Sequence, residues 1–242
     1  MSKSLTFRMI AFDAQTIPAG IYDRLTASFF HDDLKFEDES SAKRDEQSIL
    51  KWLFSRSELK EMIFEELSVK QNACHKLEVV DPIIENPRKK PGDIDVLICE
   101  QKSPHEAIAL ECKRVKVIAD DTGRDKVNKI DAIGNGVIQA NAVMNLGFHN
   151  TCLAVLTVVD GRLRKEYNTL FRGSTDETFK RVYEFPQRNK LHKDIGIMFL
   201  ELIQPTGKDI TRMAAVAVAV DRRPMPRKQP VSLNNKISAL FG

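Results

Sequence analysis

The sequence predicts an α/β protein in which a central mixed sheet is flanked by helices. Two short apolar segments, 93–99 and 107–117, have the composition of neighbouring strands and are joined by a polar turn at 100–106. A helical segment at 125–146 separates them from an unbroken apolar run at 151–159. A hairpin is antiparallel, whereas strand–helix–strand order implies a parallel pair with a crossover helix. The sheet is therefore expected to be mixed.

Composition places the chain among globular proteins of one large domain, with room for a small extension. The 242 residues are 42% hydrophobic and 29% charged, and the net charge is only +3. Any nucleic-acid-binding surface must therefore come from local clusters of cations. The four cysteines show no CxxC spacing and the five histidines form no ligand-spaced pair, which predicts reduced thiols and argues against zinc.

Targeting and membrane segments are not expected. The first 14 residues have no long apolar run followed by a small-residue cleavage site, so no signal peptide is predicted. The longest apolar runs are far shorter than a bilayer requires. We expect a cytoplasmic protein that does not engage a membrane.

The main domain is expected at 45–221, after an N-terminal extension at 1–44. Within the extension we expect a strand at 5–12, a helix at 21–30 and an acidic loop beyond it. Residues 45–68 show two apolar stripes at helical spacing and predict two helices or one bent helix. A strand is expected at 76–84.

Later elements follow from the same patterns. The helix at 125–146 contains Gly134 and Gly136, and each glycine costs about 1 kcal/mol relative to alanine. The two glycines favour either close packing on the sheet or a later helix start. Strands are expected at 195–203 and 214–220. Residues 222–242 form a basic, proline-rich tail, expected to be extended and mobile, with a short helix at 231–241.

Charged residues converge on the predicted hairpin. Side chains alternate between the faces of a strand, so folding about the 100–106 turn brings Asp95 close to Glu111 and Lys113. Carboxylates at the end of an apolar sheet are costly to bury unpaired. A hard divalent cation, Mg²⁺ or Mn²⁺, would pair them, with the backbone carbonyl of Cys112 as a third oxygen ligand. Lys113 would then orient or deprotonate a water, which suits metal-assisted hydrolysis of a phosphodiester.

These residues resemble the PD-(D/E)xK nuclease superfamily. Gly92-Asp93-Ile94-Asp95 matches its first motif, with Pro91 as a loose lead-in, and Glu111-Cys112-Lys113 matches the E-x-K motif. An E-x-K alone occurs by chance, but a G-x-x-D strand, a turn and an apolar strand ending in E-x-K is more specific. The resemblance covers roughly residues 45–160. It implies a restriction-endonuclease-like fold and Mg²⁺- or Mn²⁺-dependent cleavage of DNA rather than RNA, in restriction, phage defence or repair.

The resemblance also implies further site residues. A helix before the sheet often supplies another acidic ligand in this family, and Glu46 is the first candidate, with Glu66 as the alternative. Gln139 lies in the helix after the E-x-K strand, where relatives carry a glutamine near the site. The aromatic residue that sometimes follows that glutamine is absent, because Val143 stands there.

Basic clusters are the expected contacts to nucleic-acid phosphates. The residues are Arg88, Lys89, Lys90, Arg114 and Lys116, with further clusters at 162–165 and 222–228. The sequence has no ATPase or helicase motif, so any motor would be a separate partner. Cutting both strands with one metal site per chain favours a homodimer.

Three alternatives stay open at the level of sequence. The hairpin could be exposed and carry ordinary surface charges, although the apolar run 108–110 leads directly into Glu111. The chain could be a non-catalytic nucleic-acid-binding or assembly subunit on the same fold. It could also be a metabolic enzyme for a small phosphorylated substrate, but the sequence offers no nucleotide-cradling loop.

Overall fold

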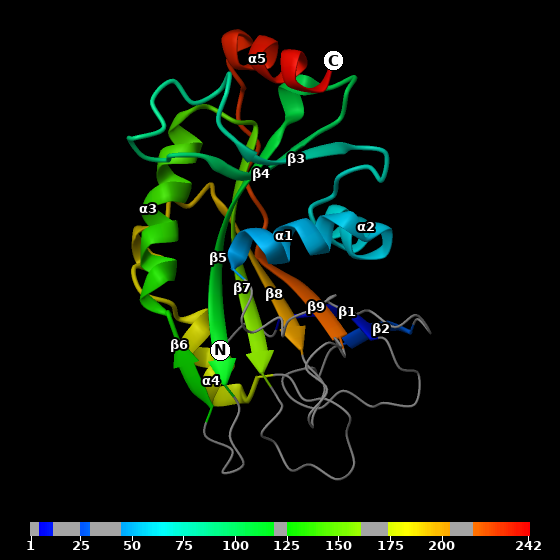
Figure 1. The fold of residues 1–242 in the computed structure, drawn as a ribbon, viewed down its shortest axis with the longest axis vertical. Helices are drawn as coiled ribbons and strands as arrows, with labels where there is room; N and C mark the ends of the chain where they lie inside the picture. Colours follow the sequence, from blue (N-terminus) through cyan, green and yellow to red (C-terminus); the bar gives the residue numbers. More distant parts are fainter. Residues whose placement is uncertain (1–4, 12–24, 30–44, 119–124, 161–173, 204–214) are drawn as a thin grey trace.

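A computed structural model describes residues 5–11, 25–29, 45–118, 125–160, 174–203 and 215–242 (Figure 1). They form a nine-stranded mixed sheet of order β2-β1-β9-β8-β7-β5-β4-β3, with β6 paired to β5. The strands are β1 (Phe7–Ala11), β2 (Leu25–Phe29), β3 (Cys74–Val79), β4 (Ile94–Cys99), β5 (Ile108–Ile118), β6 (Lys126–Asn128), β7 (Asn150–Asp160), β8 (Gly196–Ile203) and β9 (Ala215–Arg222). The predicted α/β class, with a mixed sheet flanked by helices, is confirmed.

Parallel strands form the centre of the sheet. β5, β7 and β8 are parallel, whereas β4 and β9 flank them in antiparallel pairing. Helix α3 (Asp131–Asn145) connects β5 to β7, which confirms the predicted crossover. Nearly every residue of β7 is buried, because helices cover both faces of the sheet at this point.

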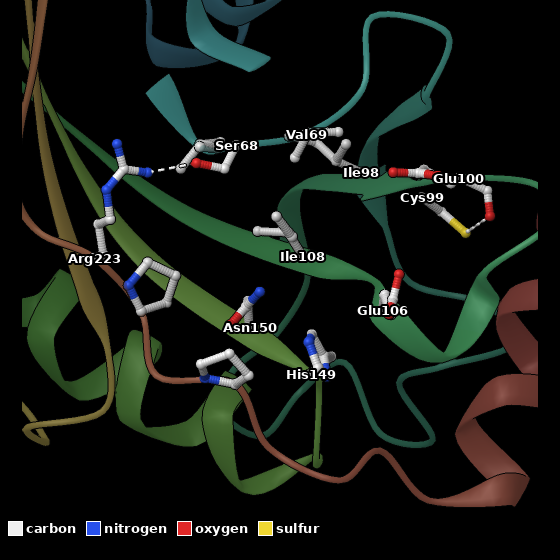
Figure 2. Close-up of a pocket in the computed structure, with 13 residues that line it drawn as sticks. Ser68, Val69, Ile98, Cys99, Glu100, Glu106, Ile108, His149, Asn150 and Arg223 are labelled. Carbon is white, nitrogen blue, oxygen red and sulfur yellow. Dashed lines mark hydrogen bonds between the residues drawn. The ribbon is translucent and has the colours of Figure 1, made fainter. Parts of the chain in front are cut away.

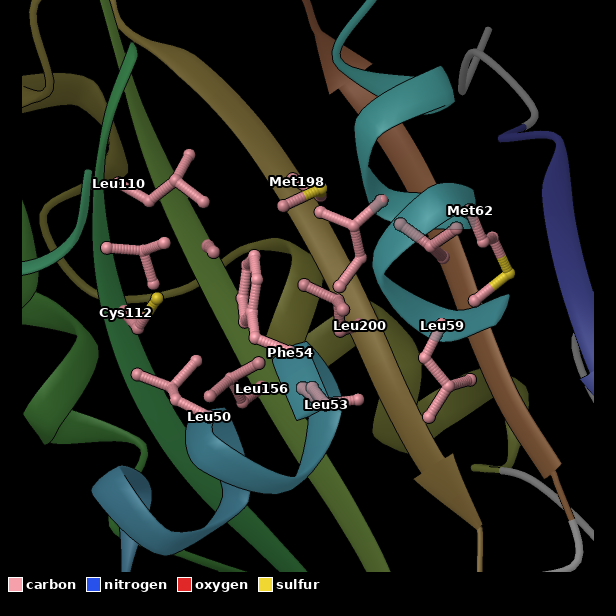
Figure 3. Packing of buried hydrophobic residues seen from close by; sticks show 14 of the residues in the cluster. Leu50, Leu53, Phe54, Leu59, Met62, Leu110, Cys112, Leu156, Met198 and Leu200 are labelled. Atoms are coloured by element: carbon pink, nitrogen blue, oxygen red, sulfur yellow. The ribbon is translucent and has the colours of Figure 1, made fainter. Parts of the chain in front are cut away.

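Two helical layers enclose the sheet (Figure 1). Helices α1 (Glu46–Ser55) and α2 (Ser57–Glu66) pack on one face, and α3 and α4 (Asp176–Tyr183) pack on the other. Figure 3 shows Leu50, Leu53 and Phe54 of α1 lying over Leu156 and Leu200 of the central strands. The predicted two-helix segment is confirmed.

Helix α1 begins and ends for local reasons. The Asp45 side chain accepts a 2.7 Å hydrogen bond from Ser48 N and caps the first turn. At Arg56 the backbone is extended, with φ −97° and ψ 120°, and the chain turns there into α2. This start places Glu46 in the first helical turn.

The crossover helix starts later than its sequence pattern predicts. Residues Lys126–Asn128 form β6, which pairs with the end of β5, and α3 begins only at Asp131. The expected start at residue 125 is therefore wrong. The apolar spacing of Val127 and Ile130 fits a helix, yet both residues pack on the α3 side of the sheet from β6 and the following turn.

The N-terminal extension contributes strands to the sheet. β1 pairs with β9, and β2 runs parallel to β1 where a helix at 21–30 was expected, so that expectation is wrong for residues 25–29. Pairing with an existing sheet edge can override local helical spacing. The acidic segment at 31–44 lies outside the described residues.

The C-terminal segment is docked on the protein. Residues 223–230 are neither helix nor strand, and Met225 N donates to Asp194 O and Arg227 N donates to His149 O, each at 2.9 Å. Helix α5 (Val231–Phe241) buries Leu233 and Ile237 against the β4 side of the sheet. The expectation of a mobile tail is therefore wrong. No helix within the described ranges has both the length and the apolar character needed to cross a membrane.

Candidate active site

The β4–β5 hairpin brings the two sequence motifs together. Val96 of β4 pairs with Leu110 of β5, so Asp95 lies beside the segment that carries the E-x-K residues. Asp95 Oδ2 accepts a 2.6 Å hydrogen bond from Cys112 N. The predicted closeness of Asp95 to Glu111 and Lys113 is confirmed.

The ammonium group of Lys113 lies among three carboxylates. Its Nζ is 2.6 Å from Glu111 Oε1, 3.5 Å from Glu46 Oε1 and 3.9 Å from Asp95 Oδ2. It also donates a 2.6 Å hydrogen bond to the carbonyl of Cys112. The four groups predicted to be metal ligands, which are three carboxylates and the Cys112 carbonyl, therefore surround the Lys113 ammonium group.

Glu46 completes this group, and Glu66 does not. Glu46 Oε2 accepts a 2.6 Å hydrogen bond from Arg114 N, so the first turn of α1 is tied to β5. Glu66 lies at the end of α2, where its backbone carbonyl accepts a 3.0 Å hydrogen bond from Arg223 Nη1. Of the two candidate helix glutamates, the structure brings only Glu46 to Lys113.

A pocket of about 330 Å³ opens beside Glu46, Asp95 and Lys113. Gln139 of α3 is at its wall and donates a 3.3 Å hydrogen bond to Pro91 O. The full lining is Asp45, Glu46, Gln47, Leu50, Leu77, Glu78, Asp93, Asp95, Lys113 and Gln139. Gln139 thus lies near the candidate site, as its position in the helix after the E-x-K strand predicted.

Three polar residues of this lining, Asp45, Gln47 and Glu78, were not singled out by the sequence. Asp45 caps α1. Gln47 follows Glu46, so the pattern that selected Glu46 could have indicated it. Glu78 lies in the edge strand β3 with a positive φ of 53°. A left-handed glutamate inside a strand has no signal in the sequence, because the residue type does not favour that conformation.

Burial raises the pKa values of Glu111 and Asp95. Burial, and after it the negative charge of Asp95, raise the pKa of Glu111 to about 8 against the opposing effect of Lys113. Burial likewise raises the pKa of Asp95 to about 6, against the influence of Lys113 and Cys112 N. For Lys113 burial lowers the pKa, but the three carboxylates outweigh it, so the net shift is upward and Lys113 stays charged.

Glu111 is the least satisfied polar side chain of the site. It is fully buried, and neither carboxylate oxygen accepts a hydrogen bond of good geometry from the described residues. Its 2.6 Å approach to Lys113 Nζ is thus an ion contact without a well-directed hydrogen bond. A buried carboxylate in this condition is costly unless a cation or a proton compensates its charge.

The donor set fits a hard divalent cation. Carboxylate and carbonyl oxygens are the ligands that Mg²⁺ and Mn²⁺ prefer. As the side chains lie, however, no group of three or more His, Cys, Asp or Glu residues in the described ranges is arranged to hold a metal ion. Lys113 Nζ lies within 4 Å of all three carboxylates and occupies the charge-compensating position itself.

The predicted phosphate contacts fall into two groups. Arg88, Lys89 and Lys90 are exposed on the loop that Gln139 holds at Pro91. Lys116 instead lies 3.9 Å from Asp160, and half-burial lowers the pKa of Arg114.

The tail cations are largely engaged in docking the tail. Arg222 donates to the carbonyls of Ile195 and His192, and Arg227 donates to the carbonyl of Met144. Arg223 donates to Ser68 as well as Glu66. The cluster at 162–165 lies outside the described residues.

Comparison with protein-family models and with curated proteins finds no match to this chain. The assignment of function therefore depends on the geometry of the site and on the motifs that the sequence carries.

Proposed function

We propose that this chain is a metal-dependent nuclease of the PD-(D/E)xK kind, built on a restriction-endonuclease-like core. The observation that carries the proposal is the convergence of Asp95, Glu111 and Lys113 on one hairpin, with Glu111 fully buried and poorly satisfied. Acids whose pKa values are shifted by burial and by a specific charged partner, beside a pocket, are typical of active sites. DNA is the favoured substrate, and restriction, phage defence or repair is the expected setting.

The residues take distinct roles in this proposal. Asp95, Glu111, the Cys112 carbonyl and Glu46 would hold Mg²⁺ or Mn²⁺. When bound, such an ion polarises a phosphoryl oxygen and makes a water more acidic. Because its pKa is raised, Lys113 acts as an ammonium group that orients the water and offsets negative charge on the phosphate. Gln139 orients the loop at Pro91 beside the pocket.

The exposed loop cations are the best candidates for binding the nucleic-acid backbone. Arg88, Lys89 and Lys90 precede the first motif directly, so a strand that contacts them would approach Asp95. Lys116 pairs with Asp160 and Arg114 is half-buried, and we assign these two a secondary role.

The test is cleavage of supercoiled and linear DNA by the purified chain in Mg²⁺, Mn²⁺ or EDTA. We expect metal-dependent cutting that is lost in Asp95→Ala and Lys113→Ala. Glu66→Ala is the matched control, because it removes a helix glutamate that does not line the pocket, and it should cut like the wild type. Salt-sensitive DNA binding without cutting, unchanged in all variants, would contradict the proposal and favour a non-catalytic binding subunit.

A further inference from the structure

Two cysteines occupy directly opposite positions on neighbouring strands. Cys74 is the first residue of β3 and Cys99 is the last residue of β4, and the antiparallel register pairs them. Both thiols are free. We propose that Cys74 and Cys99 form a reversible disulfide that links the edge strand of the sheet to its neighbour. This inference does not rest on the proposed nuclease activity.

Backbone geometry favours the bond. Directly opposed residues in an antiparallel pair have Cα atoms about 4.5 or 5.5 Å apart, and both separations lie within the roughly 4.4–6.8 Å range of disulfides. Their Cβ atoms are about 4.5–5.5 Å apart, against about 3.5–4.5 Å in a disulfide, so the strands must approach slightly. Among the described strands β3 is at the end of the sheet, so it can make that approach with β4 as its strand neighbour.

The two thiols differ in accessibility, which sets the order of reaction. Cys74 is partly exposed, whereas Cys99 is buried and its pKa is raised to about 11, first by burial and then by the nearby Cys74. Figure 2 shows the Cys99 thiol turned toward Glu100, whose carbonyl accepts its 3.3 Å hydrogen bond. Cys74 is therefore the thiol that reacts first, and Cys99 must turn away from Glu100 to follow.

The chemistry balances with a small-molecule disulfide as the oxidant. The Cys74 thiolate attacks one sulfur of the oxidant, forms a mixed disulfide and releases one thiolate. Cys99 then attacks the Cys74 sulfur, releases the second thiolate and gives up its proton to it. The net change oxidises two protein thiols to one disulfide and reduces the oxidant to two thiols.

The disulfide would act on the pair of strands β3 and β4, which contributes to the lining of the candidate site. Leu77 and Glu78 of β3 and Asp95 of β4 line the pocket at the other end of these strands. The bond would close the loop 74–99 and restrict the unfolded chain. We expect the midpoint of thermal unfolding to rise by roughly 5–10 °C on oxidation.

The test treats the whole purified chain with oxidised glutathione and maps the products by mass spectrometry. We expect a linked pair of tryptic peptides, 71–76 and 90–102, that dithiothreitol separates, together with the rise in unfolding temperature. Cys99→Ser should stop at a glutathione adduct on Cys74, and Cys74→Ser should keep Cys99 unmodified. Cys152→Ala is the matched control and should form the link normally, since Cys152 is buried in another strand.

Two results would overturn the inference. One is a wild-type chain that keeps all four thiols, or that stops at an adduct on Cys74. The other is a link that joins Cys74 to a cysteine other than Cys99. Neither result bears on DNA cleavage, so this inference and the proposed function fail separately.

Discussion

Gly136 of α3 lies directly against Lys113 of β5. A Cβ atom at position 136 would come within 2.4 Å of Lys113 Cγ and 3.1 Å of Leu153 Cδ1. The helix therefore carries a glycine where the stem of the lysine passes beneath it. A glycine inside a helix costs about 1 kcal/mol relative to alanine, and here that cost keeps the space that Lys113 needs to reach its carboxylates.

Gly136→Ala should therefore damage both the site and the fold. The added methyl group would clash with the inner part of the lysine stem and with a buried leucine. The cost of this overpacking should exceed the gain in helix propensity, so the free energy of unfolding should fall by roughly 1–3 kcal/mol. DNA cleavage should fall because Lys113 is displaced. Urea unfolding and the cleavage assay measure the two effects.

Gly134→Ala is the matched control in the same helix. Its Cβ would lie 3.2 Å from Nε2 of Gln187, the far end of a flexible side chain that can move aside. We expect stability within about 1 kcal/mol of the wild type and normal cleavage. Equal losses of stability and of cleavage in Gly134→Ala and Gly136→Ala would show that the effect comes from α3 in general and not from Lys113.

In the proposed site Lys113 would compete with a metal for the same carboxylates, because its Nζ contacts Glu46, Asp95 and Glu111. In EDTA at pH 8, Lys113→Met should lower the free energy of unfolding by up to roughly 3–5 kcal/mol, since Glu111 loses its cation. Adding Mg²⁺ should then raise the unfolding temperature by more than it does in the wild type. DNA cleavage should stay lost.

Lys116→Met is the control for this comparison. Lys116 lies on the same strand but pairs with Asp160, so its removal should leave the response to Mg²⁺ unchanged. A smaller Mg²⁺-induced rise in Lys113→Met than in the wild type would argue that Lys113 supports the metal-binding arrangement and does not compete with it.

The docked tail makes a further prediction about stability. Gln229 is buried, and its amide donates to Pro104 O at 2.7 Å and to Asn234 Oδ1 at 2.8 Å, while its Oε1 accepts from His149 N at 3.0 Å. Gln229→Ala leaves these three partners unpaired and should cost roughly 2–4 kcal/mol in urea unfolding. Lys228→Ala, at an exposed neighbouring position, should change stability by less than about 0.5 kcal/mol. If Gln229→Ala unfolded at the same urea concentration as the wild type, the docked tail would contribute little to the stability of the fold.

The sequence predicts well those features that depend on local patterns. The β4–β5 hairpin, the two helices at 45–68 and the β5–α3–β7 crossover all have the apolar periodicity of their elements, and the hairpin alone is enough to bring Asp95 to Glu111. The strand β2 and the docked tail could not be predicted in this way. Their conformations depend on partners remote in sequence: β1 for the strand, and His149 and Asp194 for the tail.

The candidate site shows the same division. Asp95, Glu111 and Lys113 are fixed by strand alternation, but the choice between Glu46 and Glu66 depends on where α1 lies against β5. The ion contacts of Lys113 depend on three elements at once, so the sequence could place the lysine beside the acids but could not show that it compensates their charge. The positive φ of Glu78 likewise has no local pattern to indicate it.

The raised pKa values of Asp95 and Glu111 predict how the proposed binding of a metal would depend on pH. In the absence of metal, the pKa of Glu111 is raised from its ordinary 4.5 to about 8, and that of Asp95 from 3.8 to about 6. The folded state therefore binds these protons more tightly than the unfolded state does. The contribution of these acids to stability is present below pH 4 and is lost as pH rises toward 8.

A metal ion held by Asp95 and Glu111, as we propose, would have to displace the same protons, so its stabilising effect would have the opposite dependence on pH. We expect the Mg²⁺-induced rise in unfolding temperature to be small at pH 6 and clearly larger at pH 8.5, as measured by thermal unfolding with Mg²⁺ or EDTA. Glu111→Gln should show little Mg²⁺ response at either pH, and in EDTA its stability should fall less steeply between pH 5 and 8 than that of the wild type. An equal Mg²⁺ response of the wild type at pH 6 and pH 8.5 would show that these carboxylates do not bind the ion, because no proton would then be released from them.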